Sequence, residues 1–337
     1  MIAVQNVVAV PLNECLRPYD VRRDLSQVAD LVELCFADTL DEDGQAYLRQ
    51  MRSAARNMVY LRWTSTVGEK DGVPLSGYVW EEDGKIIGNL SLIPFHVKLL
   101  HYYLIANVAV HPEHRRRGVA RALTGAALEH AQKRRATAAW LHVREENTAA
   151  VELYRSVGFS ERAQRSTWQN RPEDRKLAGS PLLVASNKRE YTNVKVGSRK
   201  GGDWHLQKAW LDRLYPAEIS WQLSLNHKWL APGFWGEFQK FFTDVRVLQW
   251  AAREGDFLMG VLAWHATATY ADDLWLAAHP EHEEAVAYDL LRHACHVLPP
   301  HRALSLDYPA GRADQAIQAA GFNLQQTLIW MSLPIPT

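Results

Sequence analysis

The tetrapeptide His-Pro-Glu-His occurs twice in this chain, as residues His111–His114 and His279–His282. Each copy follows an apolar segment typical of a strand and precedes a segment with helical apolar spacing. A hairpin sequence with two glycines comes before each copy, and Gly-Phe ends a later helical segment in both halves. Similarity at several matched positions is typical of a duplicated structural unit. The sequence therefore predicts two copies of one α/β plan.

Hydrophobic periodicity predicts the same order of elements in both halves. In the first half, strands are expected at 16–19, 102–110, 138–143 and 161–169, helices at 25–35, 46–56, 116–133 and 148–156, and a hairpin at 77–95. In the second half, helices are expected at 204–214 and 285–297, a hairpin at 248–264, and strands at 274–278 and 303–306. A length of 337 residues also favours two domains. The predicted fold class is α/β, with a mixed α+β sheet in two tandem lobes, residues 1–172 and 191–337, joined by a linker at 173–190.

Composition excludes several classes of partner. Basic and acidic residues are equal at 38 each, so no global field attracts nucleic acid or anionic lipid. Three separated cysteines, Cys15, Cys35 and Cys295, are typical of reduced thiols and not of a disulfide framework. The apolar start at 1–10 lacks the features of a signal peptide and is expected to be an edge strand or a loose arm. With no apolar run of about 18 residues, we expect a cytoplasmic protein, a monomer or homodimer, that binds neither nucleic acid nor membrane.

The first copy continues into three arginines, Arg115, Arg116 and Arg117, followed by Gly118 and an alanine-rich helix. A helix N-terminus presents unpaired backbone N–H groups and the positive end of the helix dipole, which together bind anions. A glycine there lets the backbone approach a diphosphate closely, and guanidinium groups bind phosphate oxygens. Positive side chains at a helix start otherwise oppose the dipole. The pattern therefore predicts a phosphate site rather than a merely solvated basic face.

Two motifs in this half resemble those of the GNAT acyl-CoA N-acyltransferases. Arg115-x-x-Gly118-x-Ala120 resembles the family's R/Q-x-x-G-x-G/A signature, with alanine at the position where glycine is more usual. Downstream, Asn147-x-x-Ala150-x-x-Leu153-Tyr154-x-x-x-Gly158-Phe159 is similar to the family's next segment. The resemblance covers about residues 15–169, with both motifs in order on the expected strands and helices.

The resemblance implies acetyl-CoA as co-substrate and direct transfer of its acetyl group to a primary amine. The strand that contains Val108 and Val110 would part from its neighbour at 138–143, and the pantetheine arm would bond to its backbone. The amides of Arg116, Arg117, Gly118, Val119 and Ala120 would hold the diphosphate, with the Arg115 side chain beside them. Asn147 would bond the cofactor, and Tyr154 would protonate the departing thiolate as general acid. Core packing for Tyr154 and helix capping for Asn147 are the alternative roles.

The general base and the acceptor are left open by the sequence. Many family members place a glutamate on the strand before the cradle, but this strand reads YYLIANVAV. Glu81, Glu82, His96, His101 and a water chain are the remaining candidates. The acidic stretch 38–43 is either a solvated loop or an attraction for a cationic amine. Peptide N-termini and small-molecule amines are the candidate acceptors; the tandem layout is similar to that of mycothiol synthases, although in those the C-terminal lobe is the working one. An acyl-CoA-binding sensor without turnover is the alternative outside the enzymes.

The second copy has lost the features of the cradle. Glu283 and Glu284 stand where the arginines stood, and no glycine lies between His282 and the helix. Counting back from Gly321-Phe322 places Ile317 at the position of Tyr154 and Ala310 at that of Asn147. The second lobe is therefore predicted to be a degenerate GNAT-like domain that serves packing or the acceptor cleft. Its many tryptophans are expected mainly in the core, and the histidines of the repeated tetrapeptide are expected to form a turn, with no metal.

Overall fold

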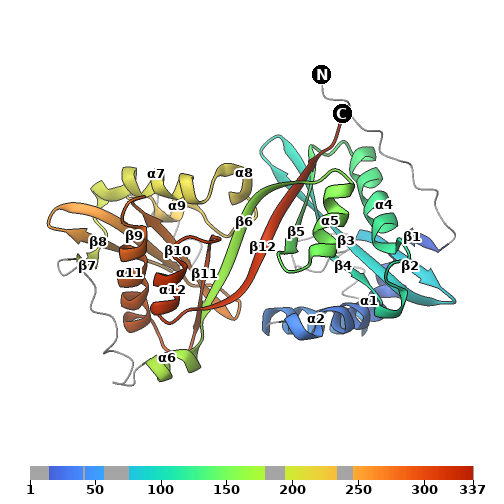
Figure 1. Ribbon diagram of the computed structural model, residues 1–337, viewed down its shortest axis with the longest axis horizontal. Coiled ribbons are helices and arrows are strands. Elements are labelled where there is room, and N and C mark those ends of the chain that lie inside the picture. Colours follow the sequence, from blue (N-terminus) through green and yellow to red (C-terminus); the bar gives the residue numbers. More distant parts are fainter. Residues whose placement is uncertain (1–14, 41, 57–75, 179–193, 234–245, 337) are drawn as a thin grey trace. The chain divides into compact units, whose positions relative to one another are not determined.

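The computed structural model describes residues 15–40, 42–56, 76–178, 194–233 and 246–336 (Figure 1). By its internal contacts the chain divides into two compact units: residues 1–162 together with 329–337, and residues 163–328. The units are defined by contacts and draw strands from both halves of the sequence, so the domain boundaries predicted at 172 and 191 stay predictions. The N-terminal arm and the linker residues 179–190 lie outside the described residues.

The first unit is built on a mixed sheet. Its elements are β1 (Leu16–Pro18), α1 (Val21–Phe36), α2 (Glu42–Arg56), β2 (Ser76–Glu82), β3 (Lys85–Val97), β4 (Leu100–Val110), α4 (Val119–Lys133), β5 (Ala138–Arg144), α5 (Thr148–Ser156) and the end of β12 (Asn323–Pro334). The strand order is β1-β2-β3-β4-β5-β12. The pair β4–β5 is parallel, and the pairs β1–β2, β2–β3 and β3–β4 are antiparallel. The final strand of the chain therefore completes the first sheet beside β5.

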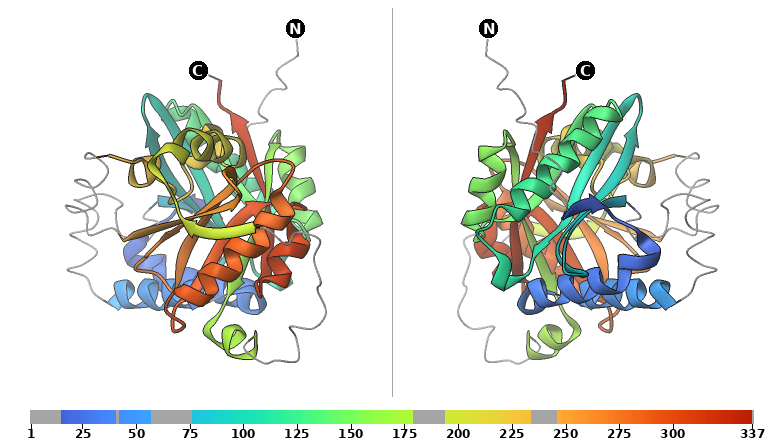
Figure 2. Two further views of the ribbon diagram at one scale, coloured as in Figure 1. Left: turned by 90° about the vertical axis from the view of Figure 1, so that its left-hand side faces the viewer. Right: turned by 90° about the vertical axis from the view of Figure 1, so that its right-hand side faces the viewer.

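Two helical layers cover opposite faces of this sheet. On one face α1 and α2 bury side chains such as Leu25 and Leu48 against Val79 of β2. On the other face α4 and α5 bury Leu123 and Val151 against strands β3, β4 and β5. Figure 2 (right) shows α4 in green lying across the strands, with α1 and α2 in blue. Each large apolar side chain that is fully buried contributes about 1.5–3 kcal/mol, so each face has its own stabilising core.

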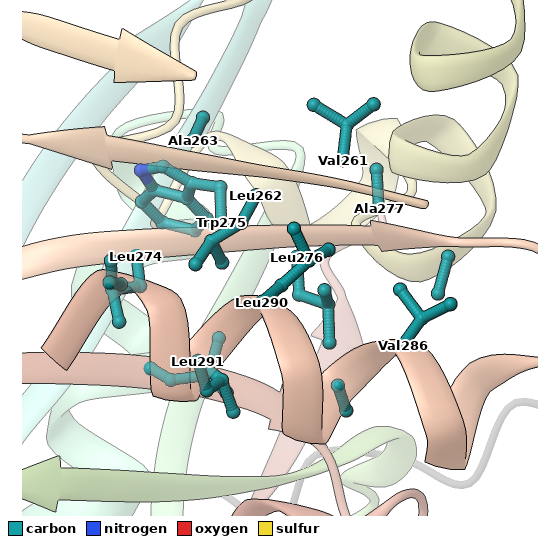
Figure 3. Close-up of a cluster of buried hydrophobic side chains, with 14 of the residues drawn as sticks. Val261, Leu262, Ala263, Leu274, Trp275, Leu276, Ala277, Val286, Leu290 and Leu291 are labelled. Atoms are coloured by element: carbon teal, nitrogen blue, oxygen red, sulfur yellow. The ribbon is translucent and has the colours of Figure 1, made fainter. Parts of the chain in front are cut away.

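The second unit repeats this plan. Its elements are most of β6 (Ser160–Asn170), α6 (Pro172–Ala178), β7 (Val194–Ser198), α7 (Trp204–Leu214), α8 (Ala217–Ser220), α9 (His227–Leu230), β8 (Val247–Glu254), β9 (Phe257–His265), β10 (Ala271–Ala278), α11 (Glu283–Val297), β11 (Ala303–Pro309), α12 (Asp314–Ala319) and the start of β12. Its strand order is β12-β6-β11-β10-β9-β8-β7. Val286, Leu290 and Leu291 of α11 pack on β9 and β10 (Figure 3), as the expected helical spacing requires.

The junctions of strand and helix in the two units share one backbone hydrogen bond and one close approach at a glycine. The N–H of His111 donates to the carbonyl of Ile87 at 2.8 Å, and that of His279 donates to Met259 at 2.8 Å. A Cβ atom added to Gly88 would lie 2.7 Å from Val119 Cγ1, and one added to Gly260 would lie 2.2 Å from Val286 Cγ1. In each unit a glycine of the hairpin thus lets the following helix approach the sheet closely.

Some boundaries differ from those expected. Helix α4 begins at Val119 and not at Arg116, because Arg116 and Gly118 have left-handed backbones with φ of 65° and 83°. Part of the acidic stretch is helical, since α2 starts at Glu42, where the helix dipole favours an acid. Part of the expected linker forms α6. Among the described helices, none is both long and apolar enough to cross a membrane.

Candidate active site

Strands β4 and β5 separate in front of α4. Their parallel pairing runs from Tyr102↔Ala138 to Ile105↔Leu141 and ends there, although the strands continue to Val110 and Arg144. Beyond the last pair, the edge of β4 that contains Val108 and Val110 has no ladder partner on β5. An unpaired strand edge offers backbone donors and acceptors to an extended ligand. This parting is the geometry that the resemblance to the GNAT enzymes implies for a pantetheine arm.

A bulge in β4 lies beside the point of separation. Ala109 pairs with Asn89 and Ala106 with Ser91, so Asn107 and Val108 together oppose one residue of β3. Asn107 has φ of 51°, a left-handed conformation that asparagine tolerates better than most residues. The bulge therefore changes the direction of the backbone N–H groups just where the two strands separate.

Four polar side chains hold this bulge in place. Asn89, which is 1% exposed, donates from Nδ2 to the carbonyl of Asn107 at 2.9 Å. The Nδ2 of Asn107 donates to the hydroxyl of Tyr47 at 2.9 Å and to Ser91 Oγ at 3.4 Å. Burial raises the pKa of Tyr47 to about 12, so its hydroxyl stays protonated over the physiological range. Helix α2 is thereby tied directly to the bulge.

The turn after β4 exposes the backbone at the start of α4. A Cβ atom added to Gly118 would meet nothing within 4 Å, so the space in front of the helix N-terminus is open. Residues 115–118 are exposed, while Val119 is 2% exposed and anchors the helix in the core. The first N–H groups of a helix have no acceptor within the helix itself. Their arrangement over 116–120 suits an anionic group at this end of the gap.

Two of the three arginines contact their own unit. Arg117 forms an ion pair with Glu82 at 2.8 Å and lies 2.6 Å from His114 Nδ1. Arg115 donates from Nε to the carbonyl of Val110 at 3.3 Å. All three arginine side chains are exposed. The charge of Arg117 is therefore paired with Glu82, and contact of the three guanidinium groups with phosphate stays a prediction.

Asn147 and Tyr154 occupy opposite ends of α5. The Oδ1 of Asn147 accepts the N–H of Ala150 at 3.2 Å, so this residue caps the helix, as its alternative role required. Tyr154 is 6% exposed and packs edge-to-face on Phe159, with the ring centroids 5.9 Å apart. Burial raises the pKa of Tyr154 to about 12. Such a phenol keeps its proton at neutral pH, as a proton donor must.

Comparison with known proteins agrees with this geometry. Residues 36–159 match the Acetyltransferase (GNAT) family. This segment of the chain is therefore similar to the GNAT acetyltransferases. The [ribosomal protein bS18]-alanine N-acetyltransferase of Escherichia coli is 44% identical over 55 residues, 16% of this chain and 37% of that protein. The mycothiol acetyltransferase of Thermobispora bispora is 51% identical over 53 residues, 16% of this chain and 18% of that protein. The chain therefore spans well under half the length of these curated relatives.

Two solved structures share the GNAT fold over nearly the whole chain. A tandem GNAT protein from the clavulanic acid biosynthesis pathway has a TM-score of 0.50 at 14% identity, covering 96% of this chain and 98% of its own. A GCN5-related N-acetyltransferase from Sphaerobacter thermophilus has a TM-score of 0.56 at 14% identity, covering 96% and 97%. At this identity the likeness concerns the fold alone. The predicted fold class, mixed α/β with two tandem GNAT-like lobes, is confirmed.

The second GNAT-like unit fills its own helix start with acids. Glu283, the first residue of α11, accepts hydrogen bonds from the Tyr308 hydroxyl and from Arg312, and its side chain is 10% exposed. Glu284 accepts the N–H of Ala316 at 3.2 Å. Acids at a helix N-terminus satisfy the dipole internally. These contacts support the prediction that the second unit has no diphosphate site.

The helix that corresponds to α5 has also lost its polar groups. Ile317 lies in α12 and is fully buried, where an apolar side chain suits the core. The N-cap residue of α12 is Ala313. Counting along the sequence had placed the position that corresponds to Asn147 at Ala310, three residues earlier. Helix α12 is also shorter than α5. Ala313 makes no side-chain capping bond. Neither the acid nor the asparagine of the GNAT motif is therefore available at these positions.

The sequence candidates for the general base lie away from the gap. Glu81 is bound to Arg17 and Arg23, and Glu82 to Arg117. His96 and His101 stack with centroids 4.5 Å apart at the β3–β4 hairpin end, where β4 begins. Burial, together with His96 and Arg134 nearby, lowers the pKa of His101. None of these four side chains is at the bulge, and the roles of Asn147 and Tyr154 beside the start of α4 stay predictions.

The two copies of the repeated tetrapeptide form turns. The Nδ1 of His111 accepts the N–H of Glu113 at 3.4 Å, and that of His279 accepts the N–H of Glu281 at 3.3 Å. In each copy the two histidines and the glutamate place one ligand atom each within 4.8 Å of the others. The hydrogen bond from a backbone N–H gives the first histidine in each turn a structural role without a metal. The absence of a metal there stays a prediction.

Proposed function

We propose that the first unit is an N-acetyltransferase that moves the acetyl group of acetyl-CoA to a primary amine. The observation that supports this most is the parting of β4 and β5 after the Ile105↔Leu141 pair, directly before the exposed start of α4. An extended thiol arm suits the first feature and a diphosphate suits the second. The family of the chain uses this chemistry, and we assign it to the unit that retains the cradle.

In this proposal the residues of the chain bind, orient and transfer a proton. The backbone of Val108 and Val110 bonds the pantetheine arm, the amides of 116–120 with Arg115 hold the diphosphate, and Asn147 bonds the cofactor from the cap of α5. The acceptor nitrogen forms a bond to the acetyl carbon while the carbon–sulfur bond breaks. Tyr154 gives its phenolic proton to the sulfur, which its high pKa permits at neutral pH.

The acceptor is a small-molecule or peptide amine. One relative is named for acetylation of an alanine of a ribosomal protein, and another is named a mycothiol acetyltransferase. Both names support amines, of two different kinds, as the class of acceptor. The formal net charge of zero gives no reason to expect a nucleic-acid partner.

Release of free thiol from acetyl-CoA tests the proposal. The purified chain is assayed with a peptide that begins with a free alanine amine, with D-glucosamine and with a diamine, and acetylated product is identified by mass spectrometry. We expect amine-dependent thiol release from at least one of these, and a rate about 100-fold lower in Tyr154→Phe. Tight binding of acetyl-CoA with no transfer to any amine would instead favour the sensor without turnover.

A further inference from the structure

The side chains of β5 divide between the two faces of the first sheet. Ala139, Leu141 and Val143 lie in the core beneath α4 and α5. Side chains alternate along a strand, so His142 points to the opposite face. That is the face on which Tyr47 of α2 contacts Asn107. His142 is partly exposed, whereas its strand neighbours on both sides are buried.

His142 also stands at the start of the gap. The last paired residues are Ile105 on β4 and Leu141 on β5, and His142 follows immediately. The next residue of β4 is Ala106, and the bulge residues Asn107 and Val108 follow it. His142 therefore lies one residue beyond the last pair on β5, and the bulge begins two residues beyond it on β4, on the other side of the gap.

The final strand fixes the orientation of this imidazole. Trp330 of β12 stacks on His142 with the ring centroids 4.2 Å apart and an interplanar angle of 23°. Trp330 is 3% exposed, so it is a rigid surface for the ring. Stacking places the indole against the flat face of the imidazole and not against the edge of the imidazole, where its two nitrogens lie. Residues 329–337 belong to the first unit, so this contact lies wholly within it.

We propose that His142 is the proton acceptor of the reaction, receiving the proton that the acceptor amine loses. This inference rests on the proposed acetyl transfer. As the carbon–nitrogen bond forms and the carbon–sulfur bond breaks, one N–H proton of the amine moves to a ring nitrogen of neutral His142, directly or through one water. Tyr154 supplies a different proton to the sulfur. The two residues then return to their starting forms by exchange of one proton with solvent, which leaves an amide and a free thiol.

Histidine suits this task for chemical reasons. As a residue type, histidine is the usual proton acceptor of enzymes that work near neutral pH. Beyond the last pair on this face of β5, the side chain that follows is Arg144, which lacks an accepting atom. Tyr47, the polar hydroxyl on the other side, is held protonated by its raised pKa and is no base.

The test compares His142→Gln with His96→Gln, the loss of an exposed histidine of β3 at the β3–β4 hairpin. Steady-state transfer is measured with acetyl-CoA and the best amine of the panel above, from pH 5.5 to 9, with thermal melting to check folding. We expect kcat for His142→Gln to fall about 100-fold, a usual contribution of a general base. The KM for acetyl-CoA and the melting temperature should change little, and His96→Gln should behave as wild type.

Two further readouts separate a base from a packing role. In wild type, log kcat should rise with pH to a plateau, and this limb should vanish in His142→Gln. Added imidazole should accelerate His142→Ala in proportion to its concentration, without affecting wild type. An unchanged kcat and pH profile in a folded His142→Gln overturns the role of His142 as proton acceptor and leaves the proposed acetyl transfer standing. A wild-type chain that transfers to no amine overturns the proposed function, and the role of His142 falls with it.

Discussion

The Nδ2 atom of Asn107 lies 2.9 Å from the hydroxyl of Tyr47, which ties helix α2 to the bulge of β4. Asn107 has φ of 51°, so its side-chain bonds stabilise a backbone conformation that most residues avoid. The conformation and the side-chain bonds are separable by substitution. They make different predictions for stability and for catalysis.

Asn107→Gly keeps the positive φ at no steric cost and loses the bonds to Tyr47 and Ser91, whereas Asn107→Ala loses the bonds and strains the backbone as well. We expect urea unfolding to show Asn107→Ala less stable than Asn107→Gly by about 1 kcal/mol. Tyr47→Phe should cost about 1 kcal/mol, the usual contribution of one hydrogen bond. Equal stability of the alanine and glycine variants would show that the left-handed backbone is not under strain.

The proposed role of Tyr154 as general acid predicts how activity depends on alkaline pH. Its phenol must be protonated to act as an acid, and its pKa is raised to about 12, so activity should not be lost through Tyr154 until the pH nears that value. Tyr154→Phe should lower kcat about 100-fold while acetyl-CoA binds as before. Isothermal calorimetry and steady-state kinetics separate these effects. A kcat in Tyr154→Phe equal to that of wild type would restrict this residue to packing.

The same raised pKa affects folding. The folded-state pKa of Tyr154 exceeds the unfolded value of about 10. The buried phenol therefore contributes stability that is fully present below about pH 10 and is lost as the pH rises toward 12. Urea unfolding of wild type and Tyr154→Phe at pH 7, 9 and 11 measures this. The wild type should lose more stability than the variant between pH 9 and 11, and parallel losses would contradict the cause given for the shift.

Two glycines set the distance between helix and sheet in the two units. A Cβ on Gly88 would lie 2.7 Å from Val119 Cγ1, and one on Gly260 would lie 2.2 Å from Val286 Cγ1. Gly88→Ala and Gly260→Ala should each destabilise the chain by about 1–3 kcal/mol through overpacking. Only Gly88→Ala should also weaken acetyl-CoA binding, because it displaces the start of α4. Adding Val286→Ala to Gly260→Ala should restore stability, and no rescue would mean that the valine methyl group is not the obstacle.

The sequence predicted most elements because their signals are local. The Asp83-Gly84 turn has positive φ at both residues, as a tight hairpin turn requires, and α7 has the bounds expected from its apolar spacing. Asn147 as a cap followed from residue type. These features depend on neighbouring residues alone.

The missed features depend on contacts between distant parts of the chain. The final strand completes the first sheet, so Trp330 stacks on His142, 188 positions earlier in the sequence. The bulge at Asn107 depends on Asn89 and Tyr47, which no periodicity connects. One signal was present: His142 is a polar residue within a strand that is otherwise largely apolar. A polar residue at such a position is a candidate for function even when its partners are unknown.

The central claim is that acetyl-CoA binds at the start of α4 and not at the corresponding start of α11. Isothermal calorimetry of acetyl-CoA binding tests it most directly. The wild type is compared with a variant that combines Arg115→Asp, Arg116→Asp and Arg117→Asp. Glu284→Gln is the control in the second unit. The account predicts one molecule per chain, affinity at least about tenfold weaker after the reversal, and no change in the control. Two molecules per chain, or undiminished affinity after the reversal, would contradict it.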